Sequence, residues 1–510
     1  MTSGSRIQVS GFGSVGLTGP DWEAIELLAM RRLVNDSRAV KPGDTFVAYP
    51  GQTRDGRDYI AQAIAIGATS VLWERAGFRW DPRWRVPNLG VRALRLHVGA
   101  IAARLHGHPS RRLRVIGVTG TNGKTTCSQW IAQALTRCGR RCAVIGTLGY
   151  GMRAPLKPLA NTTPDALWLH EQLADFARRG AQAVAMEVSS IGLDQDRVAG
   201  IEFDTALFTN LSRDHLEYHR TMRRYQEAKA RLFAWTTLRH AVVNLDDDFG
   251  AALARRIRRP GLEVIGYGFG AGRGARTPRV AGAHLVSGVR GVSFDVRTPW
   301  GAAHVTGPLP GRHNAANLLG ILAVLLAVGV PLRRATAALA ALRPLPGRLQ
   351  RLGGGAKPLV VVDYAHTPDA LKHALLTLRE LLDTHDPRST IHDPRLICVF
   401  GCGGERDPGK RPQMGRVAAQ LADGVVVTSD NPRGEEPAEI IQDIVAGVPG
   451  GADSVEIEPD RRAAILRTVA MARRGDIVLV AGKGHESTQE IRGVQLPFSD
   501  AAVAREALSR

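Results

Sequence analysis

The sequence predicts an α/β protein of about three domains, and three observations lead to that prediction. At 510 residues the chain is too long for a single hydrophobic core. From residue 113 onward, apolar strand patterns alternate with helical patterns, which implies parallel sheets covered by helices. A linker rich in Gly and Pro is expected at residues 343–358, and it precedes a second series of the same kind. We therefore expect domains over residues 1–112, 113–343 and 344–510.

The expected elements follow in chain order. Residues 1–112 contain short apolar runs interrupted by Gly and Pro, and they predict a strand at 44–49, a helix at 59–67 and a linker at 106–112. In the central domain a helix is expected at 124–137. The buried strands expected there are residues 115–118, 183–188, 205–209 and 241–244.

The rest of the chain continues this pattern with two exceptions. Residues 266–308 are rich in Gly, Val, Thr and Arg and predict short antiparallel strands. The longest apolar run, at 318–332, is stopped by Pro331 and predicts a buried helix, since a membrane span needs about 18 or more apolar residues. The strands expected in the last domain are residues 359–362, 396–400, 424–428 and 477–481.

Composition narrows the class of protein. The net charge of +19 raises the possibility of nucleic-acid binding, but the basic residues are scattered in pairs without interleaved aromatics, so we expect no nucleic-acid partner. Anionic substrates would benefit from the same field. The five cysteines fit neither a disulfide framework nor a zinc site, and no export signal is visible, so a cytoplasmic location is expected. Cys402 could be a catalytic thiol, although no Cys/His arrangement accompanies it.

Lysine is rare in this chain. Of 67 basic residues only eight are lysines, so a lysine that is present points to a place that needs a compact primary amine. Four of the eight lie in the motifs described below, namely Lys124, Lys229, Lys410 and Lys483.

A glycine-rich segment that follows a buried strand and opens a helix predicts a phosphate site. It reads Gly117-Val-Thr-Gly-Thr-Asn-Gly-Lys-Thr-Thr126 and departs from the general P-loop pattern only at Val118. Its glycines let backbone N–H groups approach phosphates, Lys124 can reach the outer phosphates, and the Thr125 hydroxyl can hold Mg²⁺.

This segment resembles the ATP loop of the Mur ligase family and of its folylpolyglutamate synthase relatives. The resemblance extends over nearly the whole chain and implies a UDP-substrate domain, a central P-loop-type ATPase domain and a Rossmann-like C-terminal domain. It also implies ATP as co-substrate. The residues implied around the nucleotide are Gly120, Thr121, Asn122, Gly123, Lys124, Thr125, Thr126, Asn317, Arg348 and Asp363.

Three further segments resemble the family's metal site. They imply Glu187 and His215 as Mg²⁺ ligands and Lys229 as a carbamylated lysine, with Thr125 as a further ligand. Carbamylation converts a cation into a carboxylate-like anion, and only a primary amine can undergo it, so arginine cannot replace this lysine. Taken alone, Lys229 could instead be an ordinary solvated helix residue.

Short polar motifs resemble the family's sites for the UDP-linked substrate. Ile191 departs from the pattern, because relatives usually have His there, so a role for that His cannot apply. The substrate residues implied are Ser37, Gln52, Thr53, Arg54, Thr162, Thr163, Ser189, Gln195 and Arg197.

The segment Asp430-Asn-Pro-Arg433 resembles the signature of family members that accept meso-diaminopimelate. Arg433 and Arg406 can pair with the distal carboxylate of that amino acid, and Asp430 and Glu486 can pair with its ammonium. The residues implied around it are Arg406, Asp430, Asn431, Pro432, Arg433, Gly482 and Glu486.

The resemblance as a whole implies an ATP-dependent amide-bond ligase. Lys124, Lys229, His215, Glu187 and Arg348 would be its catalytic residues. It would add meso-diaminopimelate to the D-glutamate of UDP-N-acetylmuramoyl-L-alanyl-D-glutamate through an acyl phosphate. We expect it to use Mg²⁺ and to act as a monomer. A lysine-adding sister ligase and a folylpolyglutamate synthase-like ligase are the alternatives.

Overall fold

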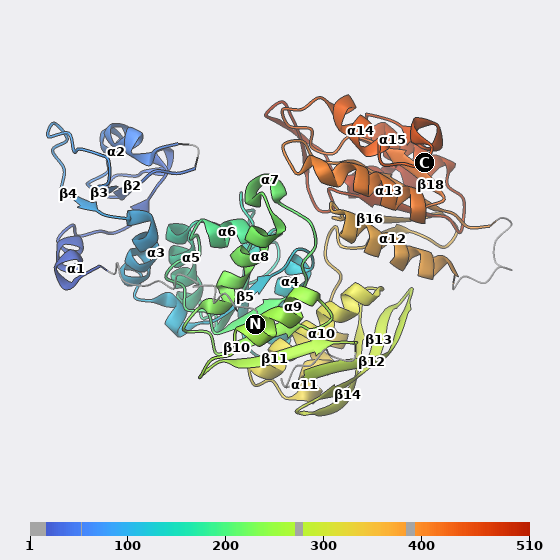
Figure 1. The fold of residues 1–510 in the computed structure, drawn as a ribbon, viewed down its shortest axis with the longest axis horizontal. Helices are drawn as coiled ribbons and strands as arrows, with labels where there is room; N and C mark the ends of the chain where they lie inside the picture. Colours follow the sequence, from blue (N-terminus) through green and yellow to red (C-terminus); the bar gives the residue numbers. More distant parts are fainter. Residues whose placement is uncertain (1–16, 53, 271–278, 384–392) are drawn as a thin grey trace, which may run out of the picture. The chain divides into compact units, whose positions relative to one another are not determined.

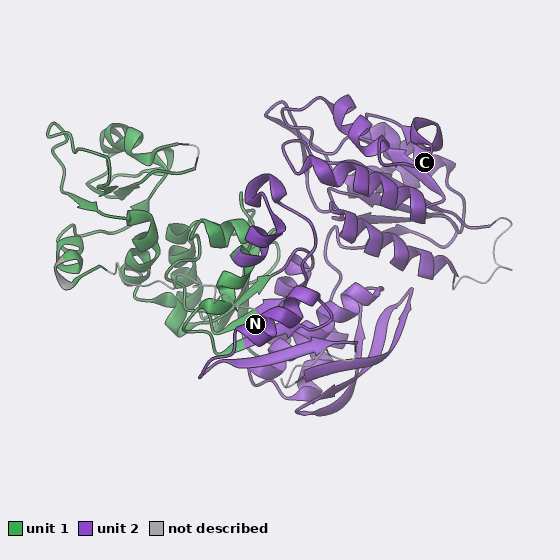
Figure 2. Cartoon of the chain, in the orientation of Figure 1, with its two compact units in different colours: residues 1–119, 139–206, 228–240 green, residues 120–138, 207–227, 241–510 purple. Residues whose placement is uncertain are grey.

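The computed structural model describes residues 17–52, 54–270, 279–383 and 393–510 (Figure 1). These residues form two compact units, each assembled from several stretches of chain (Figure 2). Unit 1 comprises residues 1–119, 139–206 and 228–240, and unit 2 comprises residues 120–138, 207–227 and 241–510. Within the described residues, no helix is both long and apolar enough to cross a bilayer.

The first described element of unit 1 is helix α1 (Gly19–Glu26). A small parallel sheet of order β1-β2-β3-β4 follows it. The strands are β1 (Leu33–Val34), β2 (Thr45–Ala48), β3 (Ser70–Glu74) and β4 (Asn88–Val91). Helix α2 (Ile60–Ile66) follows β2 and confirms the predicted helix. Helix α3 (Leu94–Leu105) packs its buried Val98 and Ile101 in one cluster with Leu72 of β3 and Leu167 of a later helix, α5 (Ala166–Arg178).

A second set of strands in unit 1 is largely parallel. Strand β8 (Ala183–Glu187) pairs in parallel with β5 (Arg114–Thr119) on one side and β6 (Cys142–Gly146) on the other. A short strand, β7 (Gly149–Gly151), runs antiparallel to β6. Strands β9 (Thr205–Phe208) and β10 (His240–Asn244) contain the points where the chain passes from unit 1 to unit 2.

The first part of unit 2 contains the helix that follows the phosphate loop, α4 (Lys124–Arg137), with the predicted bounds. Its strands are β11 (Glu263–Gly268), β12 (Arg279–Gly288), β13 (Gly291–Thr298) and β14 (Gly301–Gly307). The predicted antiparallel pairing is confirmed for β12, β13 and β14, although β12 reaches 10 residues and β11 pairs with it in parallel.

The apolar run before Pro331 forms a buried helix, as predicted, with different bounds. Helix α10 (Arg312–Ala327) is apolar around most of its circumference and contacts α4, β11 and β12. Pro331 then caps the next helix, α11 (Leu332–Ala340), so the two helices are separate.

The C-terminal part of unit 2 is a six-stranded sheet of order β15-β16-β20-β17-β18-β19. Strands β16 (Leu359–Asp363), β20 (Ile477–Ala481), β17 (Leu396–Phe400), β18 (Gly424–Val427) and β19 (Glu456–Ile457) are parallel. The first strand, β15 (Gln350–Gly353), is antiparallel to β16 and corrects the prediction that residues 343–358 are only a linker. The helices are α12 (Pro368–Asp383), α13 (Arg411–Leu421), α14 (Pro437–Val445), α15 (Arg461–Met471) and α16 (Asp500–Ser509).

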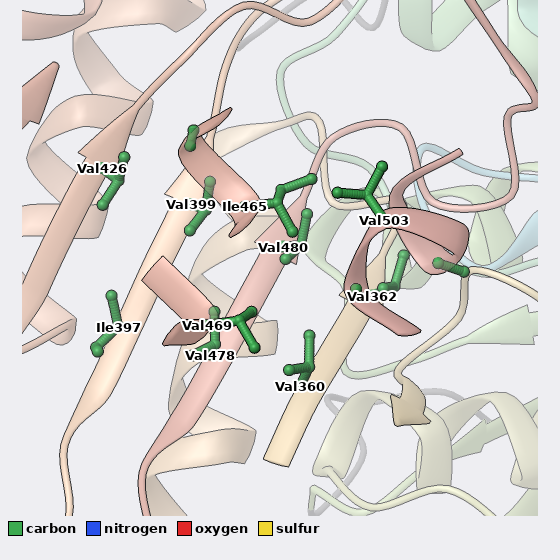
Figure 3. Packing of buried hydrophobic residues seen from close by; sticks show 13 residues of the cluster. Val360, Val362, Ile397, Val399, Val426, Ile465, Val469, Val478, Val480 and Val503 are labelled. Atoms are coloured by element: carbon green, nitrogen blue, oxygen red, sulfur yellow. The ribbon is translucent and has the colours of Figure 1, made fainter. Parts of the chain in front are cut away.

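Two of these helices cover one face of the sheet. Ile465 and Val469 of α15 and Val503 of α16 pack in one buried cluster with Val478 and Val480 of β20 and with residues of the neighbouring strands (Figure 3). Burial of each such side chain stabilises the fold by about 1.5–3 kcal/mol. The packed helices therefore stabilise the sheet. Its loops leave at the carboxyl ends of the parallel strands, where open α/β sheets bind ligands.

Candidate active site

The predicted phosphate loop is a close-packed turn at the N-terminus of α4. Gly123 has a φ of +85°, and a Cβ at this position would lie 2.6 Å from Asn317 Oδ1 on α10. At Gly120, whose φ is +150°, an added Cβ would overlap Thr209 Oγ1. These two positions require glycine for both their conformation and their space. The turn leaves backbone N–H groups at a helix N-terminus, which is a favourable place for a phosphate.

Lys124 and Arg348 converge on this loop. Lys124 Nζ donates to the carbonyls of Gly120 and Thr121 at 2.9 and 2.7 Å. Arg348 Nη2 donates to Thr125 Oγ1 at 3.0 Å, and the guanidinium stacks over the Tyr364 ring with 4.5 Å to its centroid. Arg348 Nε is buried and has no hydrogen-bond partner among the described residues. The structure thus places two cations where a polyphosphate would carry its charge.

Three other predicted nucleotide residues make contacts within or near the loop, namely Asn122, Asn317 and Asp363. Asn122 Nδ2 donates to Asp369 Oδ2 at 3.0 Å, and Cys127 Sγ contacts Asn317 Oδ1 at 3.6 Å. Asp363 ends β16 and accepts from the backbone N–H of Leu349 at 2.7 Å. Burial raises the pKa of Asp363, although Arg348 opposes this. Asp363 therefore holds the backbone next to Arg348, a role that the sequence did not predict.

Asp214 is a buried residue of this site to which the sequence analysis gave no role. Its Oδ2 lies 3.4 Å from His215 Nε2 and 3.9 Å from His366 Nε2. Burial alone would raise the pKa of Asp214, but the charges of His215, Lys410, His366 and Lys124 outweigh it and hold the pKa well below the usual range. Asp214 is therefore an anion at neutral pH, surrounded by basic groups.

The donors near the loop fit a divalent cation that is held mainly by phosphate. Within the described residues, no three His, Cys, Asp or Glu side chains are arranged to hold a metal by themselves. Mg²⁺ commonly uses only one or two carboxylates together with substrate phosphates and water. Thr125 Oγ1 and the Asp214 carboxylate supply hard oxygen atoms of that kind, and His215 Nδ1 lies 3.4 Å from Glu217 Oε1.

Glu187 and Lys229 are both buried in unit 1. Glu187, at the end of β8, accepts from the backbone N–H of Thr147 at 2.8 Å and from its hydroxyl at 3.1 Å. Lys229, near the end of α8 (Met222–Ala230), is only 1% exposed. This burial argues against the alternative that Lys229 is a solvated helix residue, because lysines are almost never fully buried unless they are paired.

Five of the predicted UDP-substrate residues form one hydrogen-bonded group in unit 1. Thr163 Oγ1 donates to the Glu187 carbonyl and contacts Ser189 Oγ at 3.0 and 3.1 Å. Arg197 donates to the Thr163 carbonyl at 2.9 Å and to Gln195 Oε1 at 2.7 Å. The hydroxyls of Thr162 and Thr147 lie 3.1 Å apart. Ser189 is also the N-cap of helix α6 (Ser190–Asp194), where its side chain accepts from the backbone N–H of Gly192.

The predicted residues near the first sheet lie at two places. Ser37 is buried in a short 3₁₀ turn and donates to Gln62 Oε1 at 3.0 Å. Gln52 and Arg54 are exposed in the loop after β2. Thr53 lies outside the described residues.

The residues predicted to bind the amino acid meet at the carboxyl ends of β18 and β20. Asn431 Nδ2 donates to Glu486 Oε2 at 2.9 Å, which joins the two predicted loops. Lys483, whose side chain is 0% exposed, donates to Asn431 Oδ1 and to Glu486 Oε2, each at 2.8 Å. A Cβ at Gly482 would lie 2.5 Å from Asp430 Oδ2, so Gly482 allows the two loops to approach each other.

Arg433 is held in place by its neighbours, whereas Arg406 is exposed. Arg433 Nη1 donates to the Gly404 carbonyl at 2.6 Å, and its Nε lies 3.4 Å from Glu490 Oε2. Glu490 belongs to β21 (Thr488–Ile491), which forms a hairpin with β22 (Val494–Pro497). Arg406 donates to the carbonyl of Glu405 at 2.9 Å. The sequence analysis missed Glu490, because its position beside Arg433 depends on the hairpin.

Cys402 does not have the environment of a catalytic thiol. It is buried with its Sγ 3.6 Å from Met414 Sδ, and burial raises the pKa of the thiol to about 12. A reactive cysteine needs a lowered pKa and some exposure. The idea of a thiol nucleophile is therefore wrong for this residue.

Comparison with known proteins gives matches along almost the whole chain. Three family models match, described as Mur ligase family, catalytic domain, over residues 31–106, Mur ligase middle domain over 118–325, and Mur ligase, glutamate ligase domain, over 347–484. Two curated relatives carry the name UDP-N-acetylmuramoyl-L-alanyl-D-glutamate--2,6-diaminopimelate ligase. The one from Chromobacterium violaceum is 50% identical and covers 96% of this chain and 97% of its own. The one from Nitrosomonas europaea is 49% identical and covers 94% and 93%.

A solved structure of a protein with the same name is also similar. It is 37% identical, covers 94% of this chain and 95% of its own, and superposes with a TM-score of 0.66. The similarity thus spans the small first sheet, the phosphate loop and the C-terminal sheet together.

Proposed function

The chain belongs to the Mur ligase family, and from this premise we infer that it is an ATP-dependent ligase of peptidoglycan precursor synthesis. It adds meso-2,6-diaminopimelate to the D-glutamate of UDP-N-acetylmuramoyl-L-alanyl-D-glutamate and releases ADP and phosphate. The observation in the structure that best supports this substrate is the hydrogen bond between Asn431 and Glu486, because it joins the two loops assigned to the amino acid.

ATP binds at the loop that precedes α4. Backbone N–H groups at the N-terminus of α4 cradle its phosphates, whereas those of Thr121 and Asn122 donate to Asn210. Lys124 turns from the loop carbonyls toward the outer phosphates. Arg348 already contacts Thr125 and has a buried Nε without a described partner, so it is poised to donate to a phosphate oxygen. Asn317 and Asp363 support the loop and the backbone beside Arg348.

Mg²⁺ is proposed to accompany the nucleotide, with Thr125, Glu187, His215 and carbamylated Lys229 as its protein ligands. When bound, the cation would neutralise charge that develops on the transferred phosphoryl group. Asp214 is a further candidate, since its carboxylate is ionised and buried beside His215.

Ligation proceeds in two chemical steps. An oxygen of the D-glutamate γ-carboxylate attacks the γ-phosphorus of ATP, and the bond to ADP breaks, which gives an acyl phosphate. The neutral amine of diaminopimelate then attacks the acyl carbon, loses a proton, and expels phosphate as the amide forms. Lys124 and Arg348 stabilise the negative charge in the first step by donating hydrogen bonds to oxygens that gain charge.

The UDP-linked dipeptide and diaminopimelate are proposed to be recognised by different sets of residues. The hydrogen-bonded group of Thr162, Thr163, Ser189, Gln195 and Arg197 is proposed to hold the UDP-linked dipeptide, with Ser37 and the loop at residues 52–54 at the nucleotide end. Arg433 and Arg406 would take the distal carboxylate of diaminopimelate, and Asp430 and Glu486 its ammonium.

Phosphate release with each candidate amino acid tests this function. With ATP and the UDP-linked dipeptide present, we expect release to depend on meso-diaminopimelate and to be far slower with L-lysine. Release with glutamate and a folate substrate would instead support a folylpolyglutamate synthase-like activity. Phosphate release with L-lysine but not with meso-diaminopimelate would support the lysine-adding ligase and contradict the proposal.

Replacement of Lys124 tests the phosphate loop. Removing one donor to a developing charge costs roughly 10²–10³-fold in rate, so Lys124→Ala should slow acyl-phosphate formation by about that factor. Binding of the UDP-linked dipeptide, measured by calorimetry, should stay nearly unchanged, because its proposed residues are elsewhere. Vigorous ATP hydrolysis by the wild type without that dipeptide would show that the loop serves another purpose.

A further inference from the structure

Arg461 is a fully buried arginine whose role nothing above assigns. It is the first residue of α15, and its side chain and that of Asp500 are both 0% exposed. Arg461 donates from Nε and Nη2 to the two oxygens of Asp500, each at 2.8 Å. It also donates from Nη1 to the Ser429 carbonyl at 3.1 Å and from Nη2 to the Ala481 carbonyl at 2.9 Å.

The two backbone acceptors identify what Arg461 connects. Ser429 directly precedes Asp430, and Ala481 directly precedes Gly482, so each carbonyl lies at the base of one of the two amino-acid loops. These loops leave β18 and β20, which are not neighbours in the sheet, because β17 lies between them and pairs with both. No backbone ladder therefore joins β18 directly to β20. The guanidinium of Arg461 spans this gap.

The charge of Arg461 also suits its position. Burial opposes its ionisation, but Asp500 and the nearby carboxylates of Asp430 and Glu486 raise the pKa of the guanidinium. A buried ion pair of this kind adds little to stability compared with a well-packed apolar pair. Its benefit is geometric, because the planar fork of arginine fixes several acceptors at once, which a lysine cannot do.

We propose that Arg461 is a positioning residue for diaminopimelate, which fixes the separation of the loops that begin at Asp430 and Gly482. It does not touch the amino acid. The inference rests on the proposed function of those loops, and it concerns how they are kept ready to bind. Asn431 and Glu486 can share their 2.9 Å hydrogen bond only if the two loop bases stay at this separation.

The fold offers a control at the opposite end of the same sheet. Arg395 Nη2 donates to Asp476 Oδ2 at 2.9 Å, and these residues immediately precede β17 and β20. The Asp476 side chain is 0% exposed, whereas that of Arg395 is 49% exposed. This ion pair ties the amino ends of the two strands, away from both loops. Arg395→Met therefore removes an Arg–Asp ion pair of the same sheet, although a less buried one, without releasing either loop.

The test compares Arg461→Lys, Arg461→Met and Arg395→Met in the full-length enzyme. For both Arg461 variants we expect the KM for meso-diaminopimelate to rise roughly 10–100-fold, the range for residues that orient a ligand's partners. The KM for ATP and for the UDP-linked dipeptide should stay within about twofold, as in Arg395→Met. Arg461→Lys keeps the charge next to Asp500, and Ile465 and Val469 still anchor α15 (Figure 3), so this variant should fold.

The possible outcomes separate the inference from the function on which it rests. If the wild type does not ligate diaminopimelate, the proposed function fails. If it does, but Arg461→Lys retains the wild-type KM for diaminopimelate, Arg461 does not position the loops. An equal rise of all three KM values, or the same rise in Arg395→Met, would assign Arg461 a purely structural role.

Discussion

Lys229→Ala is expected to lower the ligation rate by about 10³-fold, the effect of losing a buried charged partner worth about 3–5 kcal/mol. Lys229 is 1% exposed. In the proposed metal site, an ammonium would repel the Mg²⁺ that accompanies ATP. Addition of the neutral amine of Lys229 to CO₂, with loss of one proton, gives a carbamate anion, which would instead attract the cation. Short-chain carboxylates such as formate or acetate should partly restore the activity of Lys229→Ala, because they can supply the missing anion.

Two comparisons make this result specific. Lys229→Arg should not recover activity, because a guanidinium keeps its charge and forms no carbamate. Lys372→Ala, which removes an exposed lysine from α12, should behave like the wild type. Full activity of Lys229→Arg would refute the carbamate. The mass of intact protein, measured under conditions that preserve the modification, gives a readout that is independent of turnover.

Arg433→Ala is expected to remove most of the discrimination between meso-diaminopimelate and L-lysine. The two amino acids differ by the distal carboxylate, so a site built for that group leaves a guanidinium unpaired when lysine binds. Sites of this kind can reject an analogue by roughly 10⁴-fold. In the structure Arg433 is held by the Gly404 carbonyl and by Glu490, and is therefore oriented before the substrate arrives.

The measurement is the ratio of kcat/KM for the two amino acids in wild type and variant. We expect kcat/KM for diaminopimelate to fall by about 10²–10³-fold, in keeping with about 3–5 kcal/mol for a truncated buried charge pair, while the KM for ATP changes little. Arg492→Ala is the control, since Arg492 is on the hairpin that carries Glu490 but pairs at the surface with Glu436. An unchanged ratio in Arg433→Ala would show that another residue selects the amino acid.

The elements that the sequence predicted well are those with a strong local pattern. Helix α4 and strands β17 and β20 have the expected bounds. The glycine loop marks the start of α4, and each of the two strands is an uninterrupted run of apolar residues. Strand β15 was missed, since Gln350–Gly353 has no apolar pattern of its own. Its hydrogen bonds come from β16, and only the folded sheet reveals this partner.

The candidate site shows the same division. Sequence motifs predicted Lys124, Arg348, Asn431 and Glu486 as site residues. In the structure Arg348 contacts the phosphate loop that carries Lys124, and Asn431 contacts Glu486. Asp214 could not be found in this way, because its partners His366 and Lys410 are distant in sequence. Its environment follows from burial beside two histidines and close to Lys410, which a linear motif does not encode.

The interleaved path of the chain has a consequence for protein synthesis. The chain passes between the two units five times, after residues 119, 138, 206, 227 and 240 (Figure 2). Unit 1 therefore lacks part of its structure until residue 240 has left the ribosome. At about 5–20 residues per second, the 121 residues after residue 119 take roughly 6–24 s to translate. During this interval the residues of unit 1 that have already been made lack the partners that residues 228–240 supply.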